Sequence, residues 1–274
     1  MNKKSPLVSI VCTTYNHASF IRQCLDGFLM QKTNFDFEVV IHDDASTDDT
    51  KEIIEEYTLL HPDIFVPMYQ TENQYSKGVR GISIRFNLPR CRGKYIALCE
   101  GDDYWTDPNK LQKQFDLIER YPNASMCVAL NKQIYVQAGT EKIDPPYIGK
   151  HFPLIYFNDA TQYFHTSTYV IRKSMLEYLT LKYLPLFQGD TALRYLLINE
   201  GPFVVLNEVV SAYRITGLGI WSSLKRSKQL LDNHKVYKLF RKHHKSKRII
   251  YYWYKETAYW ALGMLFRIRE RIKK

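Results

Sequence analysis

Short hydrophobic runs alternate with amphipathic stretches along the first part of the chain. Residues 7–11, 37–41 and 95–99 are almost continuously apolar. Between these runs, hydrophobic residues recur three or four positions apart, most clearly over 20–29 and 53–57. Continuous runs are typical of strands buried on both faces of a sheet, and the spaced pattern is typical of helices. The alternation predicts an α/β fold with a mostly parallel central sheet flanked by helices.

The chain also divides by composition. The alternating pattern becomes less regular beyond residue 125, and from residue 224 basic side chains are interleaved with aromatic ones at helical spacing. We therefore expect one α/β domain over 1–223, with halves of about 1–125 and 126–223. A basic, aromatic helical extension is expected to follow over 224–274.

The charge of the 274-residue chain is concentrated in this extension. The whole chain carries a formal charge of +10, but residues 224–274 alone hold 16 Lys and Arg against 3 Asp and Glu. The remaining residues therefore carry 22 basic against 25 acidic side chains, a net charge of −3. Three uses of the basic extension are open: an anionic membrane surface, a solvated face of helices packed on the domain, and nucleic acid, which is the least favoured.

Several features bear on where the protein works. The five cysteines lack the paired spacing of a metal site, and three of them lie in apolar runs, as in proteins of a reducing compartment. No secretory signal is expected at the N-terminus, and no apolar run approaches the ~20 residues of a membrane span. We expect a cytoplasmic protein, with peripheral attachment to the inner face of the plasma membrane as an alternative.

The segment with the most chemical content follows the hydrophobic run at 95–99. Three carboxylates come next: Glu100, Asp102 and Asp103. Ligands of open α/β sheets bind beyond the carboxyl ends of the strands, and carboxylates crowded there favour a cation between them. Oxygen ligands suit Mg²⁺ or Mn²⁺, with a substrate diphosphate completing the coordination. A helix cap explains the nearby Asp107 but not these three acids. The glycine-rich fingerprint of dinucleotide-binding proteins is missing after the hydrophobic run at 7–11.

Three sequence blocks together resemble the family 2 glycosyltransferases, which use nucleotide sugars and have a GT-A fold with a Rossmann-like nucleotide-binding half. The match is closest to bacterial enzymes that build surface polysaccharides. The blocks are Val8–Val11 with Thr13, Tyr15 and Asn16; residues 43–50; and Gly93–Ile96 leading into Glu100–Asp103.

The resemblance implies roles for individual residues around a donor nucleotide, which we expect to be uridine diphosphate. It implies that Thr13, Tyr15 and Asp44 surround the nucleobase and ribose. It also implies a divalent metal, Mn²⁺ or Mg²⁺, which we assign chiefly to Asp103 with Asp102 beside it. A turn with a helix cap is the alternative interpretation of residues 43–49.

Two positions depart from the family pattern. Ala45 stands where the family usually has glycine, so we expect the loop not to adopt a positive φ at this residue. Glu100 replaces the family's usual Asp, and its extra methylene would move the carboxylate toward ribose or supporting contacts.

The resemblance further implies an inverting, single-displacement transfer with a base that accepts the acceptor's hydroxyl proton. Asp190 is the candidate base, although a helix cap would also explain it. Residues 213–222 could form a lid in which Arg214 meets phosphate and Trp221 covers the sugar; a hairpin end followed by a linker is the alternative. Residues 165–167 are a weaker candidate for contact with the acceptor.

The predicted function is therefore transfer of a sugar from a nucleotide sugar to a glycan or lipid-linked saccharide in surface polysaccharide synthesis. Two alternatives stay open. One is a binding protein of the same fold that lost its chemistry, against which the retained Asp102, Asp103 and Asp190 argue. The other is a sugar nucleotidyltransferase, which would need a glycine-rich, basic triphosphate loop that residues 12–17 lack.

Overall fold

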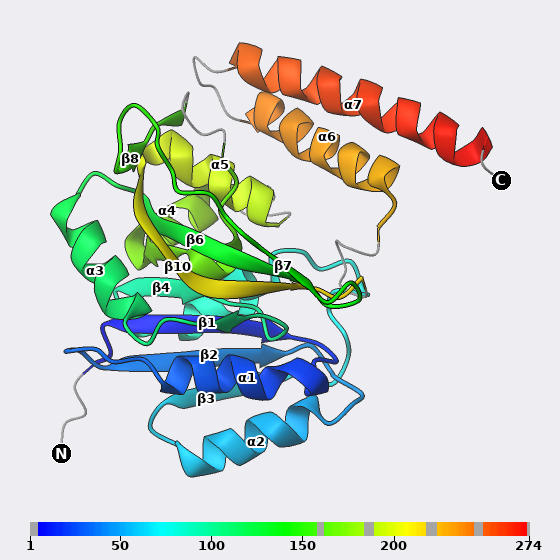
Figure 1. The fold of residues 1–274 in the computed structure, drawn as a ribbon. Coiled ribbons are helices and arrows are strands. Elements are labelled where there is room, and N and C mark those ends of the chain that lie inside the picture. Colours follow the sequence, from blue (N-terminus) through cyan, green and yellow to red (C-terminus); the bar gives the residue numbers. More distant parts are fainter. Residues whose placement is uncertain (1–4, 158–161, 184–188, 218–223, 244–248, 273–274) are drawn as a thin grey trace.

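A mixed, curled β-sheet forms the centre of the molecule in the computed structural model, and helices cover both of its faces (Figure 1). The structure describes residues 5–157, 162–183, 189–217, 224–243 and 249–272. The order of the sheet's main strands is β3-β2-β1-β4-β9-β6-β10-β5, with β7 paired to β6 and β8 paired to β10. The predicted fold class is therefore confirmed.

The elements follow one another in a βαβα order at first and less regularly later. The strands are β1 (Val8–Thr14), β2 (Phe37–Asp43), β3 (Phe65–Tyr69), β4 (Tyr95–Leu98), β5 (Tyr104–Trp105), β6 (Met126–Tyr135), β7 (Thr140–Ile143), β8 (Leu154–Ile155), β9 (Val170–Arg172) and β10 (Phe203–Ile215). The α-helices are α1 (Ala18–Leu29), α2 (Thr50–Leu60), α3 (Lys110–Arg120), α4 (Lys173–Tyr183), α5 (Asp190–Glu200), α6 (Arg226–His243) and α7 (Ile249–Ile272). Short helical turns are η1 (Ser83–Asn87), η2 (Leu88–Arg90) and η4 (Thr166–Thr168).

The sheet is parallel only in its first half. Strands β3, β2, β1 and β4 run parallel to one another, because α1 and α2 return the chain between successive strands. Beyond β4 the short strand β9 is antiparallel to both β4 and β6, although β6 and β10 are again parallel. A mostly parallel sheet is thus correct for the nucleotide half, and the second half is mixed.

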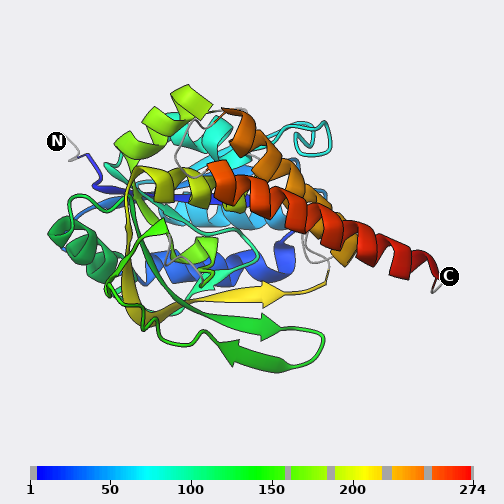
Figure 2. The ribbon, with the colours of Figure 1, turned by 90° about the horizontal axis from the view of Figure 1, so that it is seen from above.

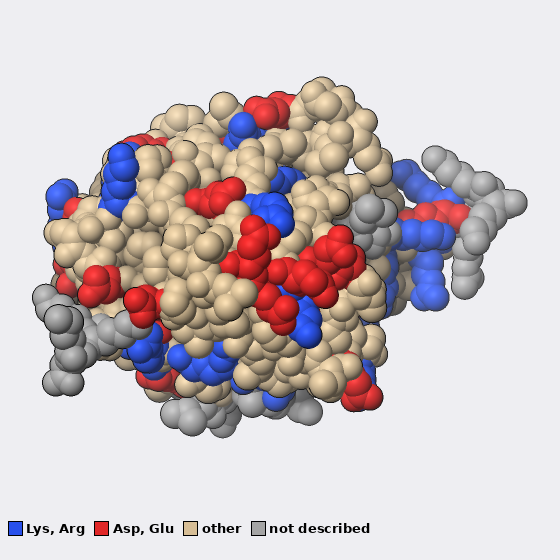
Figure 3. Space-filling view, turned by 90° about the horizontal axis from the view of Figure 1, so that it is seen from below, with Lys and Arg blue, Asp and Glu red and all other residues tan. Residues whose placement is uncertain are grey.

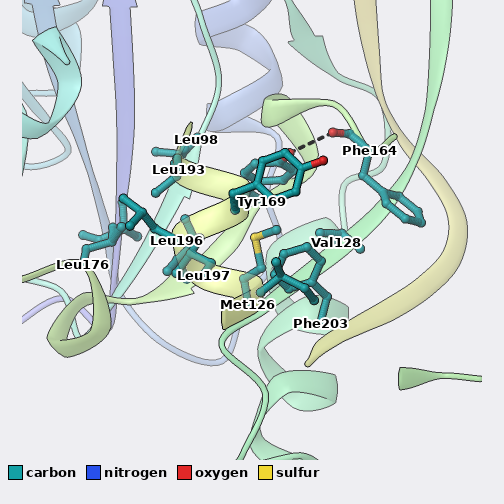
Figure 4. Close-up of a cluster of buried hydrophobic side chains, with 14 of the residues drawn as sticks. Leu98, Met126, Val128, Phe164, Tyr169, Leu176, Leu193, Leu196, Leu197 and Phe203 are labelled. Atoms are coloured by element: carbon teal, nitrogen blue, oxygen red, sulfur yellow. Dashed lines mark hydrogen bonds between the residues drawn. The ribbon is translucent and has the colours of Figure 1, made fainter. Parts of the chain in front are cut away.

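Two hydrophobic clusters lie on opposite faces of the sheet. Alternate residues of β1 point to opposite sides, so Ile10 packs toward α1 and α2 while Val11 packs toward α4 and α5. Figure 4 shows the cluster on the α4 and α5 side, where Tyr169 donates a hydrogen bond to the Phe164 carbonyl at 2.9 Å. All five cysteines are buried and have free thiols.

The extension folds as a helical pair on the α5 side of the domain. Helix α6 packs on α5 through Tyr237, whose hydroxyl donates to that of Tyr195 at 2.6 Å. Helix α7 packs on α6 in turn, and its far end projects past the body of the protein (Figure 2). None of the helices in the described ranges has the length and apolar character needed to cross a bilayer.

Candidate active site

The acidic loop 100–103 leaves the carboxyl end of β4 and is tied to the neighbouring strands. The Gly101 amide donates to the Thr13 carbonyl at 3.0 Å, and a side chain at Gly101 would collide with Thr14. Directly after the loop, β5 pairs antiparallel with β10, which places Tyr104 opposite Ala212. This pairing brings the end of β10 against the acidic loop, more than a hundred residues away in sequence.

Asp103 is buried and faces the end of β10. One carboxylate oxygen accepts the Arg214 amide at 2.9 Å, and the other lies 3.7 Å from Nδ1 of His165. The side chain is only 1% exposed. Burial, followed by repulsion from Asp102 and Glu100, raises the pKa of Asp103 well above its usual range. Its contacts are those of a group that holds the loop in place.

Glu100 is held by the turn η4. Its carboxylate accepts the Thr166 hydroxyl at 3.0 Å. Burial and the nearby charge of Asp102 raise the pKa of Glu100 to about 7, and the Thr166 hydrogen bond acts in the opposite direction. The extra methylene of Glu100 thus carries its carboxylate toward the 165–167 turn.

Asp102 is partly accessible, with 22% of its side chain exposed, whereas Asp103 is buried. One of its carboxylate oxygens lies 3.8 Å from Nε2 of His17, the residue that precedes α1. The other imidazole nitrogen of His17 is buried and has no hydrogen-bond partner. Within the described ranges, no three His, Cys, Asp or Glu side chains are arranged to hold a metal on their own.

Asp190 begins α5, directly after Gly189, whose φ of 141° turns the chain into the helix. One carboxylate oxygen accepts the amide of Thr191 at 2.6 Å, and the other accepts the hydroxyl of Tyr163 at 2.6 Å. A contact with the next amide is weaker evidence for a cap than a bond to the second or third helical amide would be. The side chain is held from two sides and remains partly exposed.

The acidic loop and Asp190 converge on the stacked rings of His165 and Tyr213, whose centroids lie 4.0 Å apart. Burial and then the charges of the loop acids and Asp190 raise the pKa of Tyr213 to about 12. Burial lowers the pKa of His165 to about 4, against the opposing effect of Asp190 and Asp102. Asp190 and the loop acids therefore lie near enough to His165 and Tyr213 to act electrostatically on the same pair of rings.

The predicted nucleotide residues lie at the carboxyl ends of β1 and β2. The Thr13 hydroxyl is within 2.8 Å of that of Ser83, and Tyr15 is 39% exposed just beyond β1. Both carboxylate oxygens of Asp44 accept backbone amides, from Gln74 at 2.9 Å and from Tyr75 at 3.0 Å. Asp44 thus organises the loop around 73–75 in this structure, while Tyr15 presents an aromatic ring outward.

Comparison with known proteins decides the family. The profile of Glycosyl transferase family 2 matches residues 9–179, more than half of the chain. The chain belongs to this family. An uncharacterised protein of Mycobacterium tuberculosis is 35% identical over 219 residues, which are 79% of this chain and 61% of that protein. The chain thus spans about three-fifths of the length of that relative.

Solved structures of low sequence identity share the fold. TarS of S. aureus in complex with UDP-GlcNAc has a TM-score of 0.68 at 17% identity, covering 92% of this chain and 71% of that one. A mannosyltransferase of Pyrobaculum calidifontis in complex with GDP-Man and Mn²⁺ has a TM-score of 0.67 at 15% identity, covering 99% and 76%. The GT-A fold expected from the sequence is therefore confirmed.

One departure from the family pattern has the opposite outcome from the one expected. Ala45 adopts a φ of 63°, so the left-handed conformation is kept although glycine is absent. The loop is fixed on both sides, because Asp44 binds the amides of 74 and 75 and the Ser46 amide donates to Asp43 at 3.1 Å. These contacts override the local preference of alanine.

The predicted lid is only partly described. Tyr213 and Arg214 belong to β10 and pair in parallel with β6, so this part is a strand and not the end of a hairpin; Trp221 lies outside the described residues. The Arg214 guanidinium donates to the Asp102 carbonyl at 2.6 Å and to Gln23, and it lies 4.4 Å from the centre of the Tyr104 ring. Arg214 therefore anchors the acidic loop in this structure.

Sequence reasoning did not assign three residues that complete the site. Thr166 binds Glu100, Tyr163 binds Asp190, and Gln23 binds Arg214. The first two lie in or near the 165–167 segment, whose position before a strand was the available signal. Gln23 lies on α1 among polar residues, and nothing local distinguishes it.

Proposed function

We propose that this protein transfers a sugar from a nucleotide sugar, most plausibly a UDP-sugar, to a glycan or lipid-linked saccharide, with inversion at the anomeric carbon. The observation that carries the proposal is the meeting of the acidic loop with Asp190 at the rings of His165 and Tyr213. Family membership and the UDP-GlcNAc bound to TarS support the choice of donor class.

The acidic loop has the chemistry of a site for a divalent ion. Burial and mutual repulsion raise the pKa of Glu100 and of Asp103, which means that the loop disfavours its own negative charge. We give Asp102 the ligand role in place of Asp103, because Asp102 is partly accessible and Asp103 is buried, and we give Asp103 a positioning role through the Arg214 amide. A divalent ion bound here supplies positive charge for the departing diphosphate. The Mn²⁺ of the archaeal mannosyltransferase complex supports this assignment.

Asp190 is proposed to accept the proton of the acceptor hydroxyl as the new glycosidic bond forms. The Tyr163 hydroxyl and the Thr191 amide fix its carboxylate, so the group is oriented before the acceptor arrives. His165 is neutral, since burial lowers its pKa to about 4, and it serves as a wall of the site with Tyr213.

Calorimetric titration tests the donor site. We expect UDP to bind in the presence of Mn²⁺ and to bind far more weakly without it, and we expect Asp102→Asn to abolish the metal-dependent part. GDP serves as the matched ligand, because the mannosyltransferase complex contains GDP-Man. Equal binding of UDP with and without metal would contradict the metal assignment. Tighter binding of GDP would redirect the choice of nucleotide.

Asp190→Asn tests the base independently. The variant keeps the shape of the side chain, so we expect unchanged UDP affinity and an unchanged melting temperature with loss of sugar transfer. Joint loss of UDP binding and folding would instead identify Asp190 as a structural group at the start of α5. A wild-type protein that binds UDP-sugars without any transfer or hydrolysis would favour the non-catalytic binding protein.

A further inference from the structure

We propose that the outward face of α7 docks on an anionic lipid bilayer. The face consists of exposed apolar side chains that repeat along the helix at Tyr254, Ala261, Leu262, Leu265 and Ile268. Their spacing of three, four and seven residues places them on one side of a helix. Helix α7 itself lies outside α6, farther from the sheet (Figure 1).

The opposite side of α7 is already occupied, which shows that the apolar face is separate from the packing of the helical pair. Tyr259 stacks on Tyr237 of α6, with ring centroids 5.3 Å apart. Glu270 accepts the hydroxyl of Ser227 at 2.6 Å, and a side chain at Gly263 would meet Leu231 at 2.9 Å. The helix therefore has one face for α6 and a second apolar face that is exposed in the part of the chain that the structure describes.

Basic residues flank the apolar face. Arg267 and Arg269 are exposed beside Leu265 and Ile268, and the sequence from 224 to 274 carries 16 basic against 3 acidic residues. An apolar helical face bordered by arginines suits a bilayer, because apolar side chains enter the boundary of the acyl chains while the cations meet anionic headgroups. This charge decides the occupant: a second copy of α7 would bring the same positive charge against itself.

The opposite end of the molecule has the opposite charge. Residues 36–63 hold 10 acidic residues against one lysine, and the exposed acids include Glu52, Glu55 and Glu56 of α2. Figure 3 shows acidic side chains gathered on the face that is seen from below, where α1 and α2 lie. An anionic surface would attract the α7 end and repel the α2 end, so the charge distribution also orients the protein with α7 toward the lipid.

Co-sedimentation of the full chain with vesicles tests the docking face. We compare vesicles of phosphatidylcholine alone with vesicles that contain about one-third phosphatidylglycerol. We expect binding to the anionic vesicles only, and we expect it to weaken in about 1 M NaCl, where the Debye length falls to about 3 Å. Leu262→Ser combined with Leu265→Ser should weaken partitioning roughly tenfold, because two exposed apolar anchors are lost.

A matched control removes leucines of the same kind elsewhere. Leu59 and Leu60 on α2 are 82% and 68% exposed, and their double replacement by serine should leave vesicle binding unchanged. Circular dichroism and UDP titration show whether each variant is folded, and failure of docking would leave the donor-site proposal untouched.

Three results would overturn the docking proposal. The first is absence of binding to anionic vesicles by the wild-type chain. The second is equal binding by the α7 and α2 variants. The third is a change of oligomeric mass, or of affinity for a nucleic acid duplex, in the α7 variant without any change in vesicle binding.

Discussion

Lys110 at the start of α3 should make the free energy of unfolding rise with pH above neutrality. The side chain is completely buried, its amine has no hydrogen-bond partner, and the nitrogen lies 4.1 Å from the centre of the Trp105 ring. Burial lowers the pKa of Lys110 to about 7, against a usual value of 10.5. The folded protein thus releases a proton that the unfolded chain keeps.

The sign follows from proton linkage. Between the folded pKa near 7 and the unfolded value of 10.5, the unfolded state binds more protons, so the free energy of unfolding rises with pH. The slope approaches about 1.4 kcal/mol per pH unit, and it averages less near pH 7, where the folded amine is half protonated. Integration gives a gain of about 1.5 kcal/mol between pH 7 and pH 8.5.

Urea unfolding of the wild type and of Lys110→Met at a series of pH values measures the contribution of Lys110. Between pH 7 and pH 8.5, we expect the free energy of unfolding of the wild type to rise by about 1.5 kcal/mol relative to that of the variant. The buried thiols of Cys99 and Cys127, with pKa values raised to about 11 and about 12, add an opposite trend above pH 8 that both proteins share. The difference in the free energy of unfolding between the two proteins therefore reports the effect of Lys110.

Lys113→Met is the matched control one turn away. Lys113 is partly exposed and bonds to Asp107 at 2.8 Å and to Glu208, and these partners raise its pKa. Its removal should leave the pH dependence over this interval unchanged. A difference between wild type and Lys110→Met that stays constant from pH 7 to pH 8.5 would refute the reasoning. It would mean that the ammonium remains charged against the Trp105 ring.

Two further predictions concern the architecture of the site. Arg214→Ala should lower the free energy of unfolding by about 3 kcal/mol, because it removes the hydrogen bonds to the Asp102 carbonyl and Gln23 and the packing on Tyr104. Urea unfolding measures this change, and a variant as stable as the wild type would contradict the anchoring role. Ala45→Gly should raise the free energy of unfolding by about 0.5 kcal/mol, because glycine adopts a positive φ without the strain that alanine has there. Thermal denaturation measures this change, and a loss of stability would contradict the idea that Ala45 is strained.

The nucleotide half could be predicted from the sequence because its signals are local. The apolar runs that became β1, β2 and β4 are nearly continuous, and each is followed within a few residues by a polar segment at the carboxyl end. Burial on both faces requires such runs, so periodicity alone indicated the strands. The acidic loop was evident for the same reason, since its charges directly follow a buried strand.

The remainder of the site depends on pairings that no local pattern encodes. Strand β5 has only two residues, Tyr104 and Trp105, and it exists because β10 lies beside it. That pairing places Arg214 against the acidic loop. The conformation of Ala45 likewise depends on distant amides that bind Asp44, so the substitution for glycine was a misleading signal.

The contacts of the acidic loop explain why the pKa values of its carboxylates stay raised, which bears on the proposed divalent ion. Arg214 lies beside the loop, where its guanidinium donates to the Asp102 carbonyl and to the Gln23 side chain and its amide donates to Asp103. His165, the imidazole next to Asp103, is neutral because burial lowers its pKa to about 4. The protein thus fixes the backbone of the loop, and the charge of Arg214 only partly offsets the repulsion among its carboxylates. The acids are held close together at the cost of raised pKa values, and an incoming ion with its diphosphate would relieve that repulsion.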